Sequence, residues 1–199
     1  MRSTGHLFRA LRQLPEAGPV GRFDATVDRF FEDHLRGHRA WDRAMYAASA
    51  AGEHSLLWLA LSAWAGWRTG RPGSTLARAG LALGAESLMV NGLVKAVFRR
   101  DRPGPGAEHP YHLRRPLTSS FPSGHASSAF FAAALLRGTP GWPIYYPLAA
   151  LVAASRAHVR VHHASDVLAG AALGTVLGEA ARHALPLGGE NGKTRQRAI

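Results

Sequence analysis

The sequence contains no cysteine. Disulfide bonds, thiolate metal sites and cysteine nucleophiles are therefore excluded, while the redox character of the compartment stays open. Acidic side chains are also scarce, because 13 Asp and Glu residues stand against 24 Lys and Arg residues and the isoelectric point is about 11.4. This excess of positive charge suits an anionic partner, whether nucleic acid, a phosphorylated substrate or an acidic membrane surface.

Other features are missing as well. The first residues, "MRSTGHLFRALRQLPEAGP", include arginines but no continuous apolar core with a cleavage site after it, so we expect no cleaved secretory signal. The positive charge is not accompanied by a nucleic-acid-binding motif or by a stripe of alternating aromatic and basic residues, so we expect no nucleic-acid partner. The sequence has no internal repeat, and its 199 residues suit a single domain with its own core.

What the sequence does contain is a series of apolar stretches rich in Ala, Leu and Gly. They lie at about 54–67, 76–98, 126–136, 144–155 and 164–181. None shows the strict alternation of a half-buried strand, and turns rich in Gly and Pro join them, together with one longer loop over 99–121. The pattern predicts an all-α fold, an antiparallel bundle of about five or six helices.

The location of this bundle is less clearly marked. A spanning helix needs about 20 apolar residues, whereas several stretches are shorter or contain Arg78, Glu86 or Asn91, and the mean hydropathy is only -0.10. The stretches are nevertheless lined with small residues that allow the close helix approach typical of membranes. These are Gly80, Gly84, Ala85, Gly170, Ala171, Gly174 and Gly178. We predict a transmembrane bundle, with a soluble helical core as the alternative.

Three regions of different character divide the chain. In residues 1–45, apolar side chains recur from Val20 onward at helical spacing, which predicts an amphipathic segment interrupted near Gly37. Residues 46–186 contain the apolar stretches and form the predicted helical domain. Residues 187–199 are polar and basic without periodicity, and they are predicted to be a disordered tail.

The first of three polar clusters closes the second apolar stretch, in "KAVFRRDRP". Lys95 and Arg102 can converge on one anion there, since the guanidinium offers a planar fork of donors and the ammonium a point charge. The alternative is that both are ordinary cations at a helix end, which complement the helix dipole or reach toward lipid headgroups.

The second cluster is "FPSGHASS". Ser123 is a good cap for a helix that begins near Gly124, and a helix start attracts phosphate through its free N–H groups. Gly124 lets the backbone approach a ligand closely, and His125 lies in the first turn, where it can donate a proton to a leaving group. Alternatively, this is simply a good helix start and His125 is incidental.

The third cluster is "SRAHVRVHHASD". Arg156 adds a further cation, and Asp166 follows His162 by four residues, which places both on one face if the segment is helical. A carboxylate on one imidazole nitrogen leaves the other free to attack, so His162 is a candidate nucleophile. A zinc site built from His158, His162 and His163 is the competing interpretation, disfavoured by the cations crowded around it.

These clusters flank the ends of different helices. In an antiparallel bundle the end of the second stretch, the start of the third, the end of the fourth and the start of the fifth all lie at the same end. We therefore expect one pocket to contain Lys95, Arg102, Ser123, Gly124, His125, Arg156, His162 and Asp166.

Together the clusters resemble the signature of the type 2 phosphatidic acid phosphatase (PAP2) superfamily. That signature reads K-x6-R-P, P-S-G-H and S-R-x5-H-x3-D, and it stands here at 95–103, 122–125 and 155–166 with every spacing intact. Three ordered motifs are far more specific than any one of them. The resemblance implies a PAP2 and haloperoxidase-like helical core, and it does not cover the first 45 residues.

The resemblance also implies a role for each signature residue. His162 would attack phosphorus and form a phosphohistidine, with Asp166 orienting it, while His125 would protonate the leaving oxygen and later activate water. The phosphoryl oxygens would be held by Lys95, Arg102, Ser123, Gly124 and Arg156. No metal and no other cofactor is implied.

Members of this superfamily include integral-membrane lipid phosphatases, soluble acid phosphatases and vanadate-dependent haloperoxidases. The short chain and the apolar helices beside each motif look most like the bacterial membrane branch, which dephosphorylates phosphatidate, phosphatidylglycerophosphate, or polyprenyl phosphates and diphosphates of cell-envelope synthesis. We therefore predict a metal-independent lipid phosphatase that interacts with a phosphorylated lipid and with membrane lipids. A haloperoxidase and a non-catalytic protein that binds anionic lipid headgroups are the alternatives.

The same branch implies a location. It predicts an integral, multi-pass protein of the cell membrane with its site facing away from the cytoplasm. Bacterial enzymes of this kind commonly have six spanning helices, whereas this sequence offers about five, with the amphipathic segment in the place of the first. That segment is expected to lie in the interface plane.

Overall fold

The computed structural model describes residues 18–103, 118–185 and 187. All regular structure in these ranges is helical, which confirms the predicted all-α class. The elements in chain order are α2 (Pro19–His34), α3 (Arg39–Ala51), the 3-10 turn η1 (Glu53–Ser55), α4 (Leu56–Arg68), α5 (Pro72–Ser87), the π-helical segment η2 (Leu88–Val94), α6 (Lys95–Val97), α7 (Gly124–Leu135), α8 (Trp142–His158) and α9 (Ala164–Ala184).

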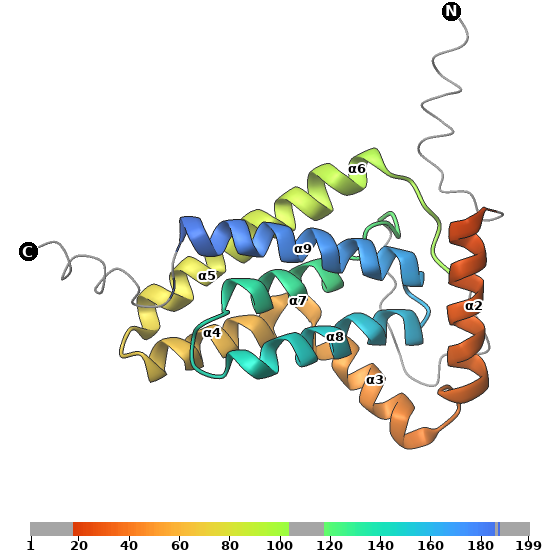
Figure 1. The fold of residues 1–199 in the computed structure, drawn as a ribbon, viewed down its shortest axis with the longest axis horizontal. Helices are drawn as coiled ribbons and strands as arrows, with labels where there is room; N and C mark the ends of the chain where they lie inside the picture. The colour runs from red at the N-terminus through yellow and green to blue at the C-terminus, as the bar shows by residue number, and fades with distance from the viewer. Residues whose placement is uncertain (1–17, 104–117, 186, 188–199) are drawn as a thin grey trace, which may run out of the picture.

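The elements from α4 to α9 form an antiparallel bundle in which α5, η2 and α6 make one long rod (Figure 1). Each predicted apolar stretch corresponds to one of these helices or to this rod. Proline stands in the first turn of α5 and of α8, where its fixed φ suits a helix start and its missing N–H costs no hydrogen bond. Proline therefore marks the starts of these two helices.

The centre of the bundle is α7. Every residue of this helix except His125 and Phe130 is buried, and most are Ala or Ser, so the neighbouring helices can approach its backbone closely. The closest neighbour is α9, whose Gly170, Gly174 and Gly178 lie directly on α7. A Cβ added at these glycines would overlap the carbonyl oxygens of Ser123, Ser127 and Phe131, respectively. The small residues of α9 thus act as predicted.

The small residues of α5 do not allow the close helix approach that was predicted for them. A Cβ added at Gly84 meets nothing within 4 Å, and one added at Gly80 makes only an ordinary contact of 3.8 Å with Leu59. Ala85 is exposed. The prediction that these three positions line a close helix approach is wrong, because α5 packs through its other face, which includes Ala79, Ala82 and Leu83.

The outer surface of the bundle is apolar. Among the described residues, one helix, Pro72–Val97, is long and apolar enough to cross a membrane by length and composition. Large apolar side chains are exposed on the other bundle helices too. On α4, the α5–α6 rod, α8 and α9 or at their ends these are Leu56, Trp64, Trp67, Leu76, Leu81, Leu88, Met89, Leu93, Val97, Trp142, Ile144, Leu151, Leu168, Val176 and Leu185. A surface of this kind is matched to hydrocarbon rather than to water.

The helix α2 runs crosswise to the bundle over the end where α8 stops and α9 starts (Figure 1). The chain turns between α2 and α3 with Gly37 at a φ of +84°, which confirms the predicted interruption. The predicted domain boundary between residues 45 and 46 falls inside α3. Of the predicted tail, only Leu187 is described; it is buried, and the rest lies outside the described residues.

Candidate active site

The polar clusters predicted from the sequence meet at the end of the bundle that α2 covers. Arg102 follows α6, Ser123 precedes α7, and His162 lies between α8 and α9. Arg102 Nη1 is 3.3 Å from His162 Nε2, which joins the first cluster to the third. The backbone N–H of Ser123 donates to the carbonyl oxygen of Asp166 at 3.0 Å, which joins the second to the third.

The start of α7 is built as predicted. Ser123 is the N-cap residue, and its Oγ accepts a hydrogen bond from the Ala126 N–H at 3.4 Å. At Gly124 the Asn91 side chain of η2 lies close to the backbone, and a Cβ at this position would stand 2.5 Å from Asn91 Oδ1, so the amide would have to move. The N–H groups of this first turn, with the positive end of the helix dipole, face the same end of the bundle as the cations.

His125 stands in this first turn. Its Nε2 is buried and, among the described residues, has no hydrogen-bond partner. The charges of Lys95, Arg102 and Arg156, as well as His162, act on this imidazole. Buried polar atoms normally have a hydrogen-bond partner. A buried imidazole nitrogen without one, close to several cations, is typical of a group that forms a hydrogen bond to a bound ligand.

His162 and Asp166 face each other, although not in the way expected. His162 lies in a bend, and α9 begins only at Ala164 after the N-cap His163, so the two are not on one face of a helix. Their closest approach is 3.8 Å, between His162 Nδ1 and Asp166 Oδ2. Ser120 stands between them, with its Oγ donating to Asp166 Oδ2 at 2.5 Å and 3.5 Å from His162 Nδ1.

The surroundings of His162 keep it uncharged. Burial is the main cause that lowers the pKa of His162 to about 4; Asp166 acts against this shift, and Arg102 and Arg156 add to it. The imidazole is therefore neutral near pH 7, with a free lone pair on one nitrogen. A nitrogen nucleophile needs this form.

Two of the cations are held in place by hydrogen bonds to the protein. Arg102 donates through Nη1 to the Val161 carbonyl at 2.6 Å and through Nη2 to the Thr118 carbonyl at 3.1 Å. Arg156 is buried, and its Nη1 donates to Ser49 Oγ of α3. Its Nε has no partner among the described residues. Lys95, in α6, acts electrostatically on the same groups.

The histidines of the zinc alternative are engaged elsewhere. His158 Nε2 lies 2.8 Å from Asp42 Oδ1, and His163 Nε2 lies 3.3 Å from the carbonyl oxygen of Asp101. In the part of the chain that the structure describes, no group of three His, Cys, Asp or Glu residues is placed to hold a metal ion. The geometry therefore gives the zinc interpretation no support.

The sequence analysis did not identify three residues of this site, Asp24, Arg100 and Ser120. Arg100 donates to Asp166 Oδ1 at 2.6 Å through Nη1, and to Asp24 Oδ2 at 2.6 Å through Nη2. Arg100 stands between other arginines in "KAVFRRDRP", and the sequence does not distinguish it from them. Asp24 lies in an amphipathic segment, where an aspartate is expected on the solvated face. Ser120 was missed as well, because serines are common in loops.

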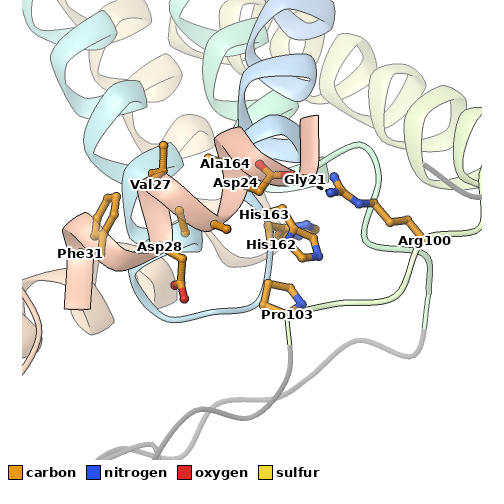
Figure 2. A pocket seen from close by; sticks show the side chains of 12 residues that line it. Gly21, Asp24, Val27, Asp28, Phe31, Arg100, Pro103, His162, His163 and Ala164 are labelled. Carbon is orange, nitrogen blue, oxygen red and sulfur yellow. Dashed lines mark hydrogen bonds and ion pairs between the residues drawn. The ribbon is translucent and has the colours of Figure 1, made fainter. Parts of the chain in front are cut away.

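A cavity of about 340 Å³ separates α2 from the loop that contains His162 (Figure 2). Figure 2 shows side chains of α2 on one side, the two adjacent histidines facing them, and Arg100 reaching toward Asp24. The lining is Gly21, Asp24, Ala25, Val27, Asp28, Phe31, Arg100, Pro103, Ala157, His162, His163 and Ala164. Helix α2 thus forms one wall of this cavity, beside His162.

An all-helical bundle that gathers two histidines and three cations at one end has the arrangement of a helical hydrolase of phosphoric esters. The chain belongs to the PAP2 superfamily, whose family model matches residues 75–187. It is 38% identical over 130 residues to a decaprenylphosphoryl-5-phosphoribose phosphatase of Mycolicibacterium smegmatis, which is 62% of this chain and 68% of that protein. The protein of the same name from Mycobacterium tuberculosis is 35% identical over 133 residues, 64% of this chain and 71% of that one.

Solved structures share the fold. A transmembrane PAP2-type phosphatidylglycerolphosphate phosphatase from Bacillus subtilis superposes with a TM-score of 0.64 at 22% identity, over 90% of this chain and 92% of that one. LpxE of Aquifex aeolicus superposes with a TM-score of 0.61 at 25% identity, over 80% and 94%. The predicted family, the transmembrane-type helical bundle and the class of phosphoric ester hydrolase are confirmed.

Proposed function

We propose that this protein hydrolyses a phosphate monoester or diphosphate of a membrane lipid, without a metal ion, through a phosphohistidine. One observation supports this above all. A buried, neutral His162 has its Nε2 beside Arg102 and Asp166 near its Nδ1, while a second imidazole, that of His125, has a buried nitrogen with no partner among the described residues. A nucleophile and a separate proton carrier are the two groups that such a reaction requires.

The chemistry proceeds in two steps. In the first, the Nε2 lone pair of His162 forms a bond to phosphorus, the bond from phosphorus to the ester oxygen breaks, and His125 gives its proton to that oxygen. In the second, His125 takes a proton from water as the resulting hydroxide attacks phosphorus, and the bond to Nε2 breaks. Phosphate leaves, and both histidines return to their starting forms.

The remaining groups stabilise the charge on the transferring phosphoryl group. Lys95, Arg102 and Arg156 supply positive charge, and the hydroxyl of Ser123 and the N–H of Gly124 supply donors at the start of α7. Positioning and electrostatic stabilisation provide most of the catalysis in phosphoryl transfer, since the loose transition state spreads charge over three oxygens. Asp166 stabilises the imidazolium that forms when His162 is phosphorylated.

A polyprenyl-linked phosphate is the substrate class that we favour. Both mycobacterial relatives are named for a decaprenyl-linked phosphoribose, and each matches more than three fifths of this chain. The likeness to the phosphatidylglycerolphosphate phosphatase is one of fold. The apolar outer surface of the bundle provides the hydrocarbon environment in which such a lipid resides.

We further propose that the protein is a multi-pass membrane protein, with the catalytic end facing away from the cytoplasm and α2 in the interface plane. The exposed apolar side chains of α4, α5, α8 and α9 support the membrane location. α2 supports the interfacial position, because it is crosswise to the bundle and exposes Phe23 and Phe30 next to charged residues. The direction of the catalytic end rests on the family resemblance.

Purified protein in detergent tests the chemistry. We expect phosphate release in the presence of EDTA from a decaprenyl-linked sugar phosphate, compared side by side with phosphatidate, phosphatidylglycerophosphate, a polyprenyl diphosphate and a water-soluble phosphate ester. His162→Ala should abolish turnover while lipid binding survives. Metal-dependent release, or halide oxidation with vanadate and peroxide in place of hydrolysis, would contradict the proposal.

The lack of cysteine makes the topology directly testable. Asp101→Cys marks the catalytic end, and Arg71→Cys marks the turn between α4 and α5 at the opposite end; both positions are exposed. We expect a membrane-impermeant maleimide to label the first and not the second in intact cells. The reverse labelling pattern would place the site on the cytoplasmic side.

A further inference from the structure

We propose that Asp24 and Arg100 are positioning residues of the reaction, because they set the orientation and the net charge of the carboxylate behind His162. The inference rests on the proposed function, in which His162 is the nucleophile. It assigns a role to α2, which begins more than fifty residues before the part of the chain that the family model matches.

The contacts form a closed and buried group. Arg100 is 9% exposed, Asp24 is 6% exposed and Asp166 is fully buried. One guanidinium nitrogen of Arg100 lies 2.6 Å from Asp166 Oδ1 and the other lies 2.6 Å from Asp24 Oδ2. A single cation therefore bridges the N-terminal helix and the catalytic carboxylate.

Ser165 completes the group. Its N–H donates to Asp24 Oδ1 at 2.8 Å, and its Oγ donates to Asp24 Oδ2 at 2.8 Å. Arg100 Nη1 donates in turn to Ser165 Oγ at 2.7 Å. Since Ser165 and Asp166 are neighbours in the first turn of α9, Asp24 ties α2 to the turn that holds the catalytic carboxylate.

The two carboxylate oxygens of Asp166 interact with different groups. Oδ1 accepts from Arg100, whereas Oδ2 accepts from Ser120 and from the His163 N–H at 2.9 Å, and it is Oδ2 that approaches His162. Arg100 therefore holds the carboxylate plane in the orientation that directs Oδ2 toward the imidazole. Without this contact the carboxylate would lose one of its three fixed partners.

The charges explain why Asp24 is needed. Arg100 and Asp166 alone would form a neutral pair, and the imidazolium formed during the reaction would face no net negative charge. With Asp24 the group has two carboxylates and one guanidinium, so one net negative charge remains behind His162. Charges act strongly over short distances in a buried site. Among the described residues, Lys95, Arg102, His125 and Arg156 also interact electrostatically with His162 or Asp166, and Asp28 and His163 line the same cavity as His162.

The sharpest perturbation is Asp24→Asn, which keeps the shape of the side chain and removes its charge. We expect kcat to fall by about tenfold while KM is unchanged, since the charge acts on the imidazolium and not on the bound substrate. Asp33→Asn is the matched control. It makes the same change of charge on the same helix, but Asp33 is exposed and does not line the cavity beside His162. Its kcat should stay within about twofold of the wild type.

A double variant separates the effect of net charge from the effect of lost buried contacts. Asp24→Asn combined with Arg100→Gln removes one charge of each sign, so Asp166 again contributes one net negative charge. We expect its kcat to exceed that of Asp24→Asn alone. A merely structural role predicts the opposite, because the double variant loses more buried contacts than the single one.

A measurement that does not depend on turnover tests the role of Asp24 separately from the proposed function. The pKa of His162, measured by NMR on protein labelled with 15N-histidine and assigned with His162→Ala, should be lower in Asp24→Asn than in the wild type and unchanged in Asp33→Asn. If the wild type releases no phosphate, the proposed function fails, and the pKa comparison still tests the group. If Asp24→Asn and Asp33→Asn match in both kcat and pKa, or if the double variant is the slowest, the inference is overturned.

Discussion

The packing of α9 on α7 leads to a prediction that joins stability to catalysis. Gly170 lies against the carbonyl oxygen of Ser123, and a Cβ at this position would also stand 3.3 Å from the Ala126 Cβ. In Gly170→Ala the two helices have to separate by about 1 Å before the new methyl group reaches normal van der Waals distance. Overpacking of this kind costs about 1–3 kcal/mol of unfolding free energy.

The separation would also distort the site. Ser123 and Gly124 form the start of α7, and Asp166 lies one turn before Gly170 on α9, so any shift between the helices changes the distance between phosphate-binding and nucleophile-supporting groups. A misplacement of about 1 Å can cost about 100-fold in rate. We therefore expect Gly170→Ala to lower kcat by one to two orders of magnitude as well as to lower the stability.

Gly84→Ala is the matched control, since it is the same substitution inside a bundle helix with nothing within 4 Å of the added Cβ. It should raise the stability by up to about 1 kcal/mol through helix propensity, and it should leave kcat unchanged. The measurements are denaturant unfolding in a fixed detergent and phosphate release at saturating substrate. Equal effects of the two substitutions would refute the packing argument.

Two other predictions follow from the side chains of the site. Arg156→Lys keeps the charge but loses the planar fork of donors at a buried position, so phosphate release should fall by at least about tenfold; an unchanged rate would show that Arg156 acts only as a point charge. His162 is expected to make the protein acid-sensitive. Because its folded pKa of about 4 lies below its ordinary value of 6.5, the unfolded chain binds more protons between these values, and the stabilisation present above pH 6.5 is lost as the pH falls to about 4. Unfolding measured across this range should show a shallower pH dependence in His162→Gln, and an identical slope would contradict the assignment.

The sequence predicts those parts of the fold and the site that depend on local pattern. The start of α7 follows from Ser123 and Gly124, and the apolar stretches mark the helices because burial requires them. The assembly of the signature residues at one end follows from antiparallel topology alone.

The remaining parts depend on contacts between distant segments. Asp24 and Arg100 are separated by 76 positions, and a charged residue on an amphipathic segment gives no sign that it will be buried against a cation. The glycines of α5 and α9 look alike in sequence, and only the packing shows that Gly170 touches a backbone while Gly84 faces open space. Long-range pairing and helix orientation are therefore what the sequence pattern could not supply.

The π-helical segment Leu88–Val94 has a consequence for how this chain can vary. It accommodates its residues in wider turns directly before Lys95, and it brings Asn91 against Gly124. Each residue of a regular α-helix advances the rotation by about 100°, and each residue of a wider π-helical turn advances it by less. If the same residues wound as a regular α-helix, Lys95 would be rotated about the axis of the rod relative to α5, so the wider turns and the placement of the lysine depend on each other.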